Sequence, residues 1–196
     1  MLRLIGFYNY TVILTYLSLV SAVVGMIQAT QHHFTAAIVC LILSGICDMF
    51  DGMVARSKKN RTDDEKAFGI QLDSLCDVIS FGAFPALLCY CMGTDGIAGC
   101  AAMCLYCVCA VIRLAFFNVI EGKRQQTEGG SNKTYRGLPV TSVAVIFPVI
   151  YVIGLFLPEL VYTIVLHVML VAMAFLFVLD FSVKKPDWQK ILTRHS

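Results

Sequence analysis

Six apolar stretches constrain the fold of this chain more than any other feature of its sequence. They cover residues of about 8–28, 34–53, 70–92, 96–119, 138–157 and 160–182. Each is close to the roughly 20 residues that a helix needs to cross the hydrocarbon core of a bilayer. Charged residues make up only 14% of the chain, whereas a soluble domain carries about 25%. The sequence therefore predicts an all-α, polytopic membrane protein with six transmembrane helices in a single domain, 1–196.

Basic residues are found in alternate connections between these stretches. The connections near 29–33, 93–95 and 158–159 contain no Lys or Arg. The other connections and the two ends contain Arg3, Arg56, Lys58, Lys59, Arg61, Lys66, Lys123, Arg124, Lys133, Arg136, Lys184, Lys185, Lys190 and Arg194. The positive-inside rule then predicts that both termini and both long loops are cytoplasmic. The first stretch is not followed by a small-residue cleavage site, so we expect it to remain as a transmembrane helix.

Four aspartates lie at the predicted cytoplasmic ends of two consecutive apolar stretches. Asp48 and Asp51 end the second stretch, and Asp73 and Asp77 begin the third. Spacings of three and four residues place each pair on one helix face. A carboxylate in an apolar segment is costly and needs a cationic partner. Ligands that are all oxygen suit Mg²⁺, Mn²⁺ or Ca²⁺, and two such ions together suit phosphoryl transfer.

Two other interpretations of these aspartates remain open. The four side chains could form a cluster at the helix ends that is solvated by the cytoplasm. Alternatively, they could belong to a cation transporter, although that class of protein favours carboxylates near the bilayer midplane and internal repeats. A net charge of +2 gives no support to a broad nucleic-acid role.

The residues around these aspartates complete a longer pattern, D-x-x-D-G-x-x-A-R, a gap, and G-x-x-x-D-x-x-x-D. Its positions are Asp48, Asp51, Gly52, Ala55, Arg56, Gly69, Asp73 and Asp77. This pattern resembles the signature of the CDP-alcohol phosphotransferases. That family transfers a substituted phosphate from a CDP-linked lipid or alcohol to a hydroxyl group and releases CMP. The gap is longer here than in the usual pattern and is polar, so we expect a longer cytoplasmic turn.

The resemblance implies a role for each of these positions. Asp48, Asp51, Asp73 and Asp77 would bind two divalent cations, Mg²⁺ or Mn²⁺, with Ca²⁺ as an alternative. Asp77 would also be the catalytic base that takes the proton of the acceptor. The nucleotide site would be formed by Asn9, Thr11, Asp48, Gly52, Ala55, Arg56 and Gly69. The resemblance further implies a homodimer in a bacterial inner membrane, with the active site facing the cytoplasm.

Three further runs indicate the acceptor. LDSLCDVISFGAFPA at 72–86, IRLAFFNV at 112–119 and YRGLPVTSVAVIFP at 135–148 resemble the serine-transferring subfamily. The substrates implied are CDP-diacylglycerol and L-serine, and the acceptor site would be formed by Arg113, Asn118 and Arg136. Serine's carboxylate, a lipid phosphate or one of the aspartates could each pair with Arg113. Glycerol 3-phosphate or an inositol phosphate is the alternative acceptor, but either would require more basic residues near the pocket.

Cysteine is frequent in the apolar stretches, with nine residues in the chain. Cys100, Cys104 and Cys107 share one helical face, but a zinc site needs ligands that converge from separate turns, often with His. We therefore expect the cysteines to be small, buried apolar side chains and not a metal or redox site.

Overall fold

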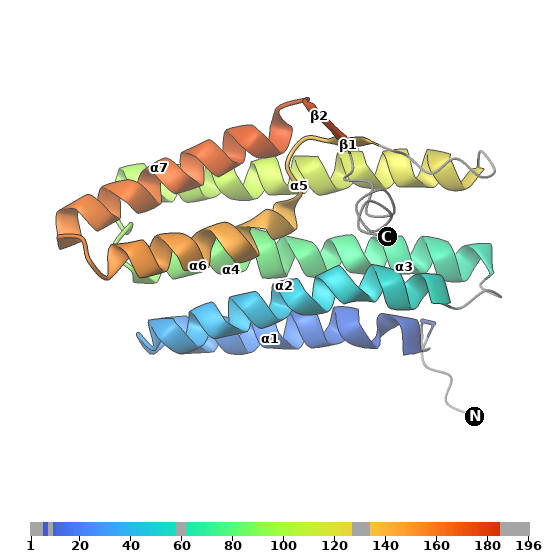
Figure 1. Cartoon of the computed structure of the whole chain (residues 1–196), viewed down its shortest axis with the longest axis horizontal. Helices are drawn as coiled ribbons and strands as arrows, with labels where there is room; N and C mark the ends of the chain where they lie inside the picture. The colour runs from blue at the N-terminus through green and yellow to red at the C-terminus, as the bar shows by residue number, and fades with distance from the viewer. Residues whose placement is uncertain (1–5, 8–9, 58–61, 127–133, 185–196) are drawn as a thin grey trace, which may run out of the picture.

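Helices form most of the part of the chain that the structure describes. The structure is a computed structural model that describes residues 6–7, 10–57, 62–126 and 134–184. The helices are α1 (Ile13–Thr30), α2 (Phe34–Ser57), α3 (Asp63–Asp77), α4 (Phe84–Cys91), α5 (Ile97–Gln126), α6 (Val143–Gly154) and α7 (Glu159–Val178). A π-helical turn (Val78–Ala83) joins α3 to α4, and short 3₁₀ turns (Tyr10–Val12 and Val140–Ser142) precede α1 and α6. The helices run roughly along one common direction (Figure 1).

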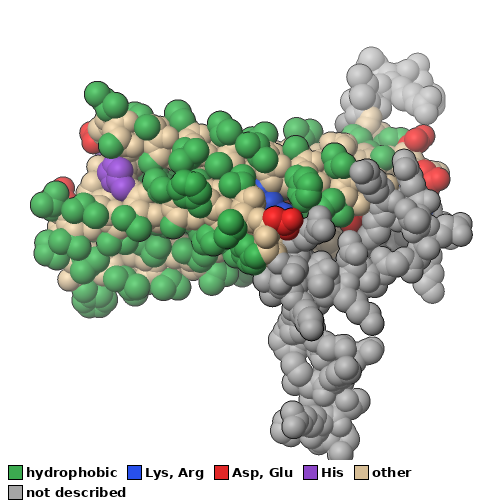
Figure 2. Space-filling view, turned by 90° about the horizontal axis from the view of Figure 1, so that it is seen from above, with side chains coloured by type: hydrophobic (Ala, Val, Ile, Leu, Met, Phe, Trp, Pro, Cys, Tyr) green, Lys and Arg blue, Asp and Glu red, His purple; other side chains and the backbone are tan. Residues whose placement is uncertain are grey.

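Five helices of the described chain are long and apolar enough to cross a membrane. They are Ile13–Thr30, Phe34–Val54, Asp63–Cys91, Ile97–Gly122 and Glu159–Val178. The third of these consists of α3, the π-helical turn and α4 as one continuous helix. Figure 2 shows that hydrophobic side chains cover most of the described surface in that view, as expected for a face in contact with lipid. The prediction of a polytopic helical membrane protein is therefore confirmed.

The sixth predicted stretch forms a helix that is shorter than expected. The apolar helix corresponding to 138–157 covers only Val140–Gly154. Pro139 before it is extended, with φ −62° and ψ 142°, and Pro158 after it is the cap of α7. Because proline lacks a backbone N–H, both residues favour helix boundaries. The count of six spans therefore stays a prediction.

The connection between α2 and α3 differs from the long turn that we expected. α2 continues to Ser57, and α3 begins at Asp63. A capping box starts α3: the Thr62 hydroxyl accepts from the Glu65 N–H at 3.2 Å, and the Thr62 N–H donates to the Glu65 carboxylate at 3.1 Å. Such reciprocal bonds satisfy the free donors of a first helical turn. Part of the polar segment between Arg56 and Gly69 is therefore helical. Helix α3 begins before the apolar part of the third stretch.

Small residues bring α1 close to α2 and α4. The buried face of α1 consists of Thr15, Ser18, Ala22, Gly25 and Ala29. The hydroxyls of Ser18 and Ser44 lie 2.7 Å apart, and each also donates to the other residue's carbonyl oxygen at 3.1 Å. Small residues and hydroxyl bonds of this kind drive helix association in membranes, where lipid is as apolar as Leu.

A two-stranded ribbon is an addition to the predicted all-helical fold. β1 (Thr134–Arg136) pairs antiparallel with β2 (Ser182–Lys184), so that Thr134 lies opposite Lys184. The N–H of Gly137 continues the pairing by donating to the Phe181 carbonyl at 2.7 Å. The ribbon joins the segment before α6 to the segment after α7, beside α5 in Figure 1. Strands of three residues give little sequence signal, because period-two alternation cannot be recognised over so short a run.

The cysteines are all free, and not all of them are buried. Cys76, Cys89 and Cys109 are buried, whereas Cys100 and Cys104 are exposed on α5. The expectation of burial is therefore wrong for these two residues. Because helix α5 is apolar on its outer side as well, hydrophobicity alone could not distinguish its lipid-facing residues from its core.

Gly25→Ala should destabilise the fold. A Cβ at Gly25 would overlap the ring of Phe84 and lie 2.9 Å from the Cβ of Cys40. Overpacking of this kind costs about 1–3 kcal/mol, which thermal unfolding in detergent would measure. Gly122→Ala is the matched control, because nothing lies within 4 Å of a Cβ at that helical position. Equal stability of the two variants would contradict the close packing of α1.

Candidate active site

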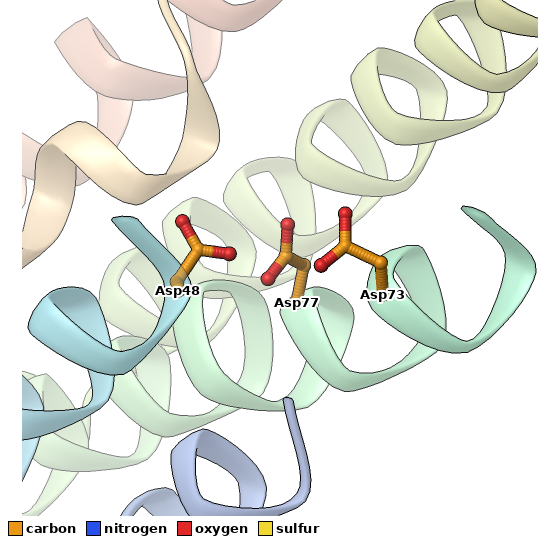
Figure 3. A group of neighbouring side chains, drawn as sticks. All are labelled: Asp48, Asp73 and Asp77. Carbon is orange, nitrogen blue, oxygen red and sulfur yellow. The ribbon is translucent and has the colours of Figure 1, made fainter. Parts of the chain in front are cut away.

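The predicted aspartates converge from α2 and α3. Asp48, Asp73 and Asp77 each provide one carboxylate oxygen, and these three oxygens all lie within 4.8 Å of one another. Figure 3 shows the three side chains together, with Asp77 between Asp48 on α2 and Asp73 on α3. Two helices whose aspartates are 22 to 29 positions apart in sequence therefore form one acidic centre, as their spacing predicts.

The fourth aspartate belongs to the same cluster. Asp51 lies within hydrogen-bonding reach of Asp73, and Asp48 lies within the same reach of Asp77. Asp51 and Asp77 are each only 8% exposed. Among the Lys and Arg residues whose side chains the structure describes, a group that does not include Arg56, none forms an ion pair with these four carboxylates. Neighbouring carboxylates repel one another strongly in such a place unless a proton or a cation lies between them.

One carboxylate oxygen of this cluster is buried without a hydrogen-bond partner. It is Oδ1 of Asp73, and this condition costs free energy unless something else satisfies the atom. The donor set consists of carboxylate oxygens only, which is the chemistry that Mg²⁺, Mn²⁺ and Ca²⁺ prefer. The residues present therefore fit a divalent cation.

Thr15 supports the cluster from α1 and was missed by the sequence analysis. Its hydroxyl donates to Oδ2 of Asp51 at 2.9 Å, and the side chain is only 6% exposed. The available signal was a polar residue within an apolar stretch, followed three positions later by Ser18. The sequence does not tell whether such a hydroxyl bonds its own helix or a neighbour, and only the packing of α1 on α2 decides this.

The predicted nucleotide residues are only partly described. Gly52 lies on α2 directly after Asp51, and Gly69 lies on α3 one turn before Asp73. Ala55 and Arg56 belong to α2, but their side chains lie outside the described residues. The same is true of the Thr11 side chain and of the whole of Asn9. Their roles in the nucleotide site stay predictions.

The Arg113 side chain interacts with Gly137 and Asp180 and not with the four aspartates. Its Nη2 donates to the carbonyl oxygen of Gly137 at 3.5 Å, and the Asp180 carboxylate is close enough to act on the guanidinium group electrostatically. Gly137 has φ +70°, and a Cβ there would lie 3.4 Å from the Arg113 guanidinium carbon. The positive φ favours glycine at this position, and the tightest neighbour of a Cβ there would be the Leu179 carbonyl oxygen at 3.0 Å. Asp180, near the C-terminal end of α7, was not singled out from the sequence.

Asn118 bridges α5 to α3. Its carboxamide oxygen accepts from the Ser74 hydroxyl at 2.6 Å, and its nitrogen donates to Gln71 at 3.4 Å. Ser74 directly follows Asp73, so this bridge lies beside the acidic cluster. Arg136, the third residue predicted for the acceptor site, is in β1, and its side chain lies outside the described residues. Acceptor binding by all three residues stays a prediction.

Comparison with known proteins places the chain in one family. Residues 8–179 match the sequence model of the CDP-alcohol phosphatidyltransferase family. The chain belongs to this family. The matched range contains all four aspartates, Gly52, Gly69 and Arg56. The resemblance to this family that the sequence indicated is therefore confirmed.

Several curated relatives carry more specific names. The archaetidylserine synthase of Methanothermobacter thermautotrophicus is 34% identical over 145 residues, which cover 74% of this chain and 58% of the relative. The CDP-diacylglycerol–serine O-phosphatidyltransferase of Helicobacter pylori is 32% identical over 141 residues, covering 71% and 55%. The enzyme of that name from Saccharomyces cerevisiae is 32% identical over 124 residues, covering 62% and 44%.

The chain spans about half the length of the curated relatives it matches. Among solved structures, none matches this chain. The family is therefore established by sequence, and the activity of the whole protein is a matter for proposal.

Thr15→Val should weaken metal binding. The substitution keeps the side-chain shape but removes the hydroxyl that orients Asp51, and a hydrogen bond to a charged group is worth roughly ten-fold in affinity. Titration of the purified protein with Mn²⁺, followed by electron paramagnetic resonance, would measure the change. Thr30→Val is the matched control, because the Thr30 hydroxyl is exposed and bonds only within α1. Equal affinities in the two variants would contradict the role of Thr15.

The effects of Ser74→Ala and Asn118→Ala on kcat/KM should not be additive. If Asn118 acts by holding Ser74, then removing either side chain breaks the same bond, and the double variant should be no worse than the worse single variant. The apparent coupling for such a neutral bond is about 1 kcal/mol, measured on kcat/KM. Strict additivity, with only Asn118→Ala raising the KM of the acceptor, would instead make Asn118 a direct acceptor ligand.

Proposed function

We propose that this protein transfers the phosphatidyl group of CDP-diacylglycerol to the hydroxyl of L-serine, giving phosphatidylserine and CMP. The observation that carries this proposal is the carboxylate cluster of Asp48, Asp73 and Asp77, in a chain that belongs to the CDP-alcohol phosphatidyltransferase family. Family membership supports the reaction class. The cluster supports a centre that handles the diphosphate of the donor.

The choice of serine rests on the names of the relatives. The names of the archaeal, bacterial and yeast relatives all contain serine, whereas they differ in the lipid part. Because relatives of three different origins share that word, serine is better supported as the acceptor than diacylglycerol is as the lipid. Glycerol 3-phosphate or an inositol phosphate is the alternative acceptor.

We propose that Asp48, Asp51, Asp73 and Asp77 hold two divalent cations, Mg²⁺ or Mn²⁺, with Ca²⁺ as an alternative. When bound, such ions neutralise the diphosphate of the donor and the charge that develops on the leaving phosphate. The buried, unpartnered oxygen of Asp73 supports this assignment. Arg56 would add a charge-assisted contact to a phosphate.

In this proposal, the serine hydroxyl displaces CMP directly, without a covalent enzyme intermediate. A serine hydroxyl is a weak nucleophile at neutral pH, so a base must lie within hydrogen-bond reach. Asp77 accepts the hydroxyl proton, and the serine oxygen forms a bond to the phosphorus attached to diacylglycerol. The bond from that phosphorus to the CMP oxygen breaks, and CMP leaves with the electron pair. Arg113, Asn118 and Arg136 would line the acceptor site, with Arg113 pairing with the serine carboxylate.

We also propose the arrangement of the protein in the membrane. The excess of Lys and Arg in alternate connections supports six spans, with both termini and the acidic cluster on the cytoplasmic side. In this topology, CDP-diacylglycerol reaches the cluster from the inner leaflet, and serine arrives from the cytoplasm. A bacterial inner membrane and a homodimer follow from the resemblance to the family.

Release of CMP from CDP-diacylglycerol by the purified protein tests the function. The reaction contains Mg²⁺ or Mn²⁺ and offers serine, glycerol 3-phosphate or an inositol phosphate separately. We expect release with serine only. Release with another acceptor would overturn serine and keep the reaction class. No release with any acceptor, from protein shown to be folded, would overturn the enzyme and favour a cation transporter.

Asp77→Asn should abolish turnover while leaving part of the nucleotide binding. An amide cannot take the proton of the acceptor, and the loss of a general base costs about 10²–10⁴-fold in rate. CMP release measures turnover, and CDP binding is measured separately. Asp63→Asn is the matched control, because Asp63 is 98% exposed at the start of α3. Near-normal turnover of Asp77→Asn would exclude Asp77 as the base.

A further inference from the structure

The helix that carries Asp73 and Asp77 changes its hydrogen-bonding pattern directly after Asp77. α3 ends at Asp77, and the π-helical turn Val78–Ala83 follows at once. At the end of this turn, the N–H of Phe84 donates to the carbonyl of Ile79, five residues back. π-Helical turns are rare in proteins, and those that occur are often found at functional sites. This one separates the acidic end of the transmembrane helix from its apolar end.

Pro85 explains why this turn needs help from another helix. In an α-helical pattern, the carbonyl of Phe81 would accept from the N–H of residue 85. Residue 85 is proline and has no N–H. Phe81 is fully buried, and an unsatisfied backbone group inside a membrane costs several kcal/mol. The α-helical donor of the Phe81 carbonyl is therefore absent, and this buried carbonyl is open to a donor from a neighbouring helix.

Tyr106 on α5 supplies that donor. Its hydroxyl donates to the Phe81 carbonyl at 2.5 Å, and the side chain is 0% exposed. The neighbouring Cys107 thiol makes a weaker contact of 3.7 Å with the carbonyl of Gly82. α5 thus contacts two successive carbonyls of the π-helical turn. The ring of Tyr106 is itself held by Phe177 of α7, at a centroid distance of 5.4 Å.

We propose that Tyr106 is a positioning residue for Asp77, acting through the carbonyl of Phe81. One residue more or less in a helical turn rotates every side chain beyond it by roughly 100°. If the π-helical turn lost its anchor, α3 could rotate relative to α4, and the Asp77 carboxylate would leave the position between Asp48 and Asp73. This inference rests on the proposed function, in which Asp77 is both a metal ligand and the base.

The test compares Tyr106→Phe with the wild type and with Tyr90→Phe, a control on the exposed side of α4. Mn²⁺ affinity, followed by electron paramagnetic resonance, reports on the carboxylates without any reaction. We expect Tyr106→Phe to weaken Mn²⁺ binding about three-fold or more and to lower kcat about ten-fold, with the KM of serine within about two-fold. Unchanged Mn²⁺ affinity and kcat, with a lower melting temperature alone, would make Tyr106 merely structural and overturn the proposal.

Pro85→Ala provides a second, independent comparison. Alanine gives residue 85 an N–H that can donate to the Phe81 carbonyl, so Tyr106→Phe should cost less Mn²⁺ affinity in the Pro85→Ala background than in the wild type. An equal cost in both backgrounds would show that Tyr106 does not act through this carbonyl. If Tyr106→Phe alone does not fold, folding of the double variant is the expected rescue, and its failure would overturn the proposal.

These measurements separate the inference from the proposed function. A wild type that binds Mn²⁺ but releases CMP with another acceptor, or with none, refutes serine transfer. The Mn²⁺ titrations of the Tyr106 and Pro85 variants still decide the role of Tyr106 in that case. A wild type that binds no Mn²⁺ would refute the metal site and, with it, this inference.

Discussion

Repulsion among four carboxylates at the end of two apolar helices is the interaction on which this structure depends. Asp48, Asp51, Asp73 and Asp77 lie within reach of one another, and two of them are almost fully buried. In a medium of low dielectric constant, such a cluster would drive α2 and α3 apart unless protons or cations lie between the carboxylates and other contacts hold the helices in place. The contacts of α1 and α5 with α2 and α3 hold the two helices in place.

Two neighbouring helices, α1 and α5, support the two helices that carry the aspartates. α1 packs on α2 through small residues and places the Thr15 hydroxyl on Asp51. α5 contacts the other helix at two levels, through Asn118 beside Asp73 and through Tyr106 beyond Asp77. Neither supporting helix provides a carboxylate to the cluster. Ligation and orientation are therefore divided between separate parts of the chain.

The sequence alone predicted the helices and the acidic centre well, because both follow from local rules. Hydrophobic length defines a membrane helix, and spacings of three and four place Asp48 with Asp51 and Asp73 with Asp77 on common faces. The contribution of Thr15 was not predictable in this way, since it depends on which side of α1 meets α2.

Other features depend on contacts between distant parts of the chain, which local patterns do not encode. The bond from Tyr106 to Phe81 joins residues 25 positions apart, and the ribbon pairs Thr134 with Lys184. The start of α3 at Asp63 was not predicted for a different reason. Thr62 followed three residues later by Glu65 is a sequence signature of a helix start. The polarity of this segment nevertheless led us to expect a turn.

The ribbon has a mechanical consequence for the last two helices. Because β1 and β2 are bonded to each other, α6 and α7 form a hairpin whose two free ends are fastened at one point. A displacement of the chain before α6 is then transmitted to the chain after α7. Arg113 lies against Gly137 at this junction, so its guanidinium group is coupled to the movement of the hairpin as a whole. Through the ribbon and this bond, the chain ends that flank α6 and α7 are both connected to α5, which carries Arg113.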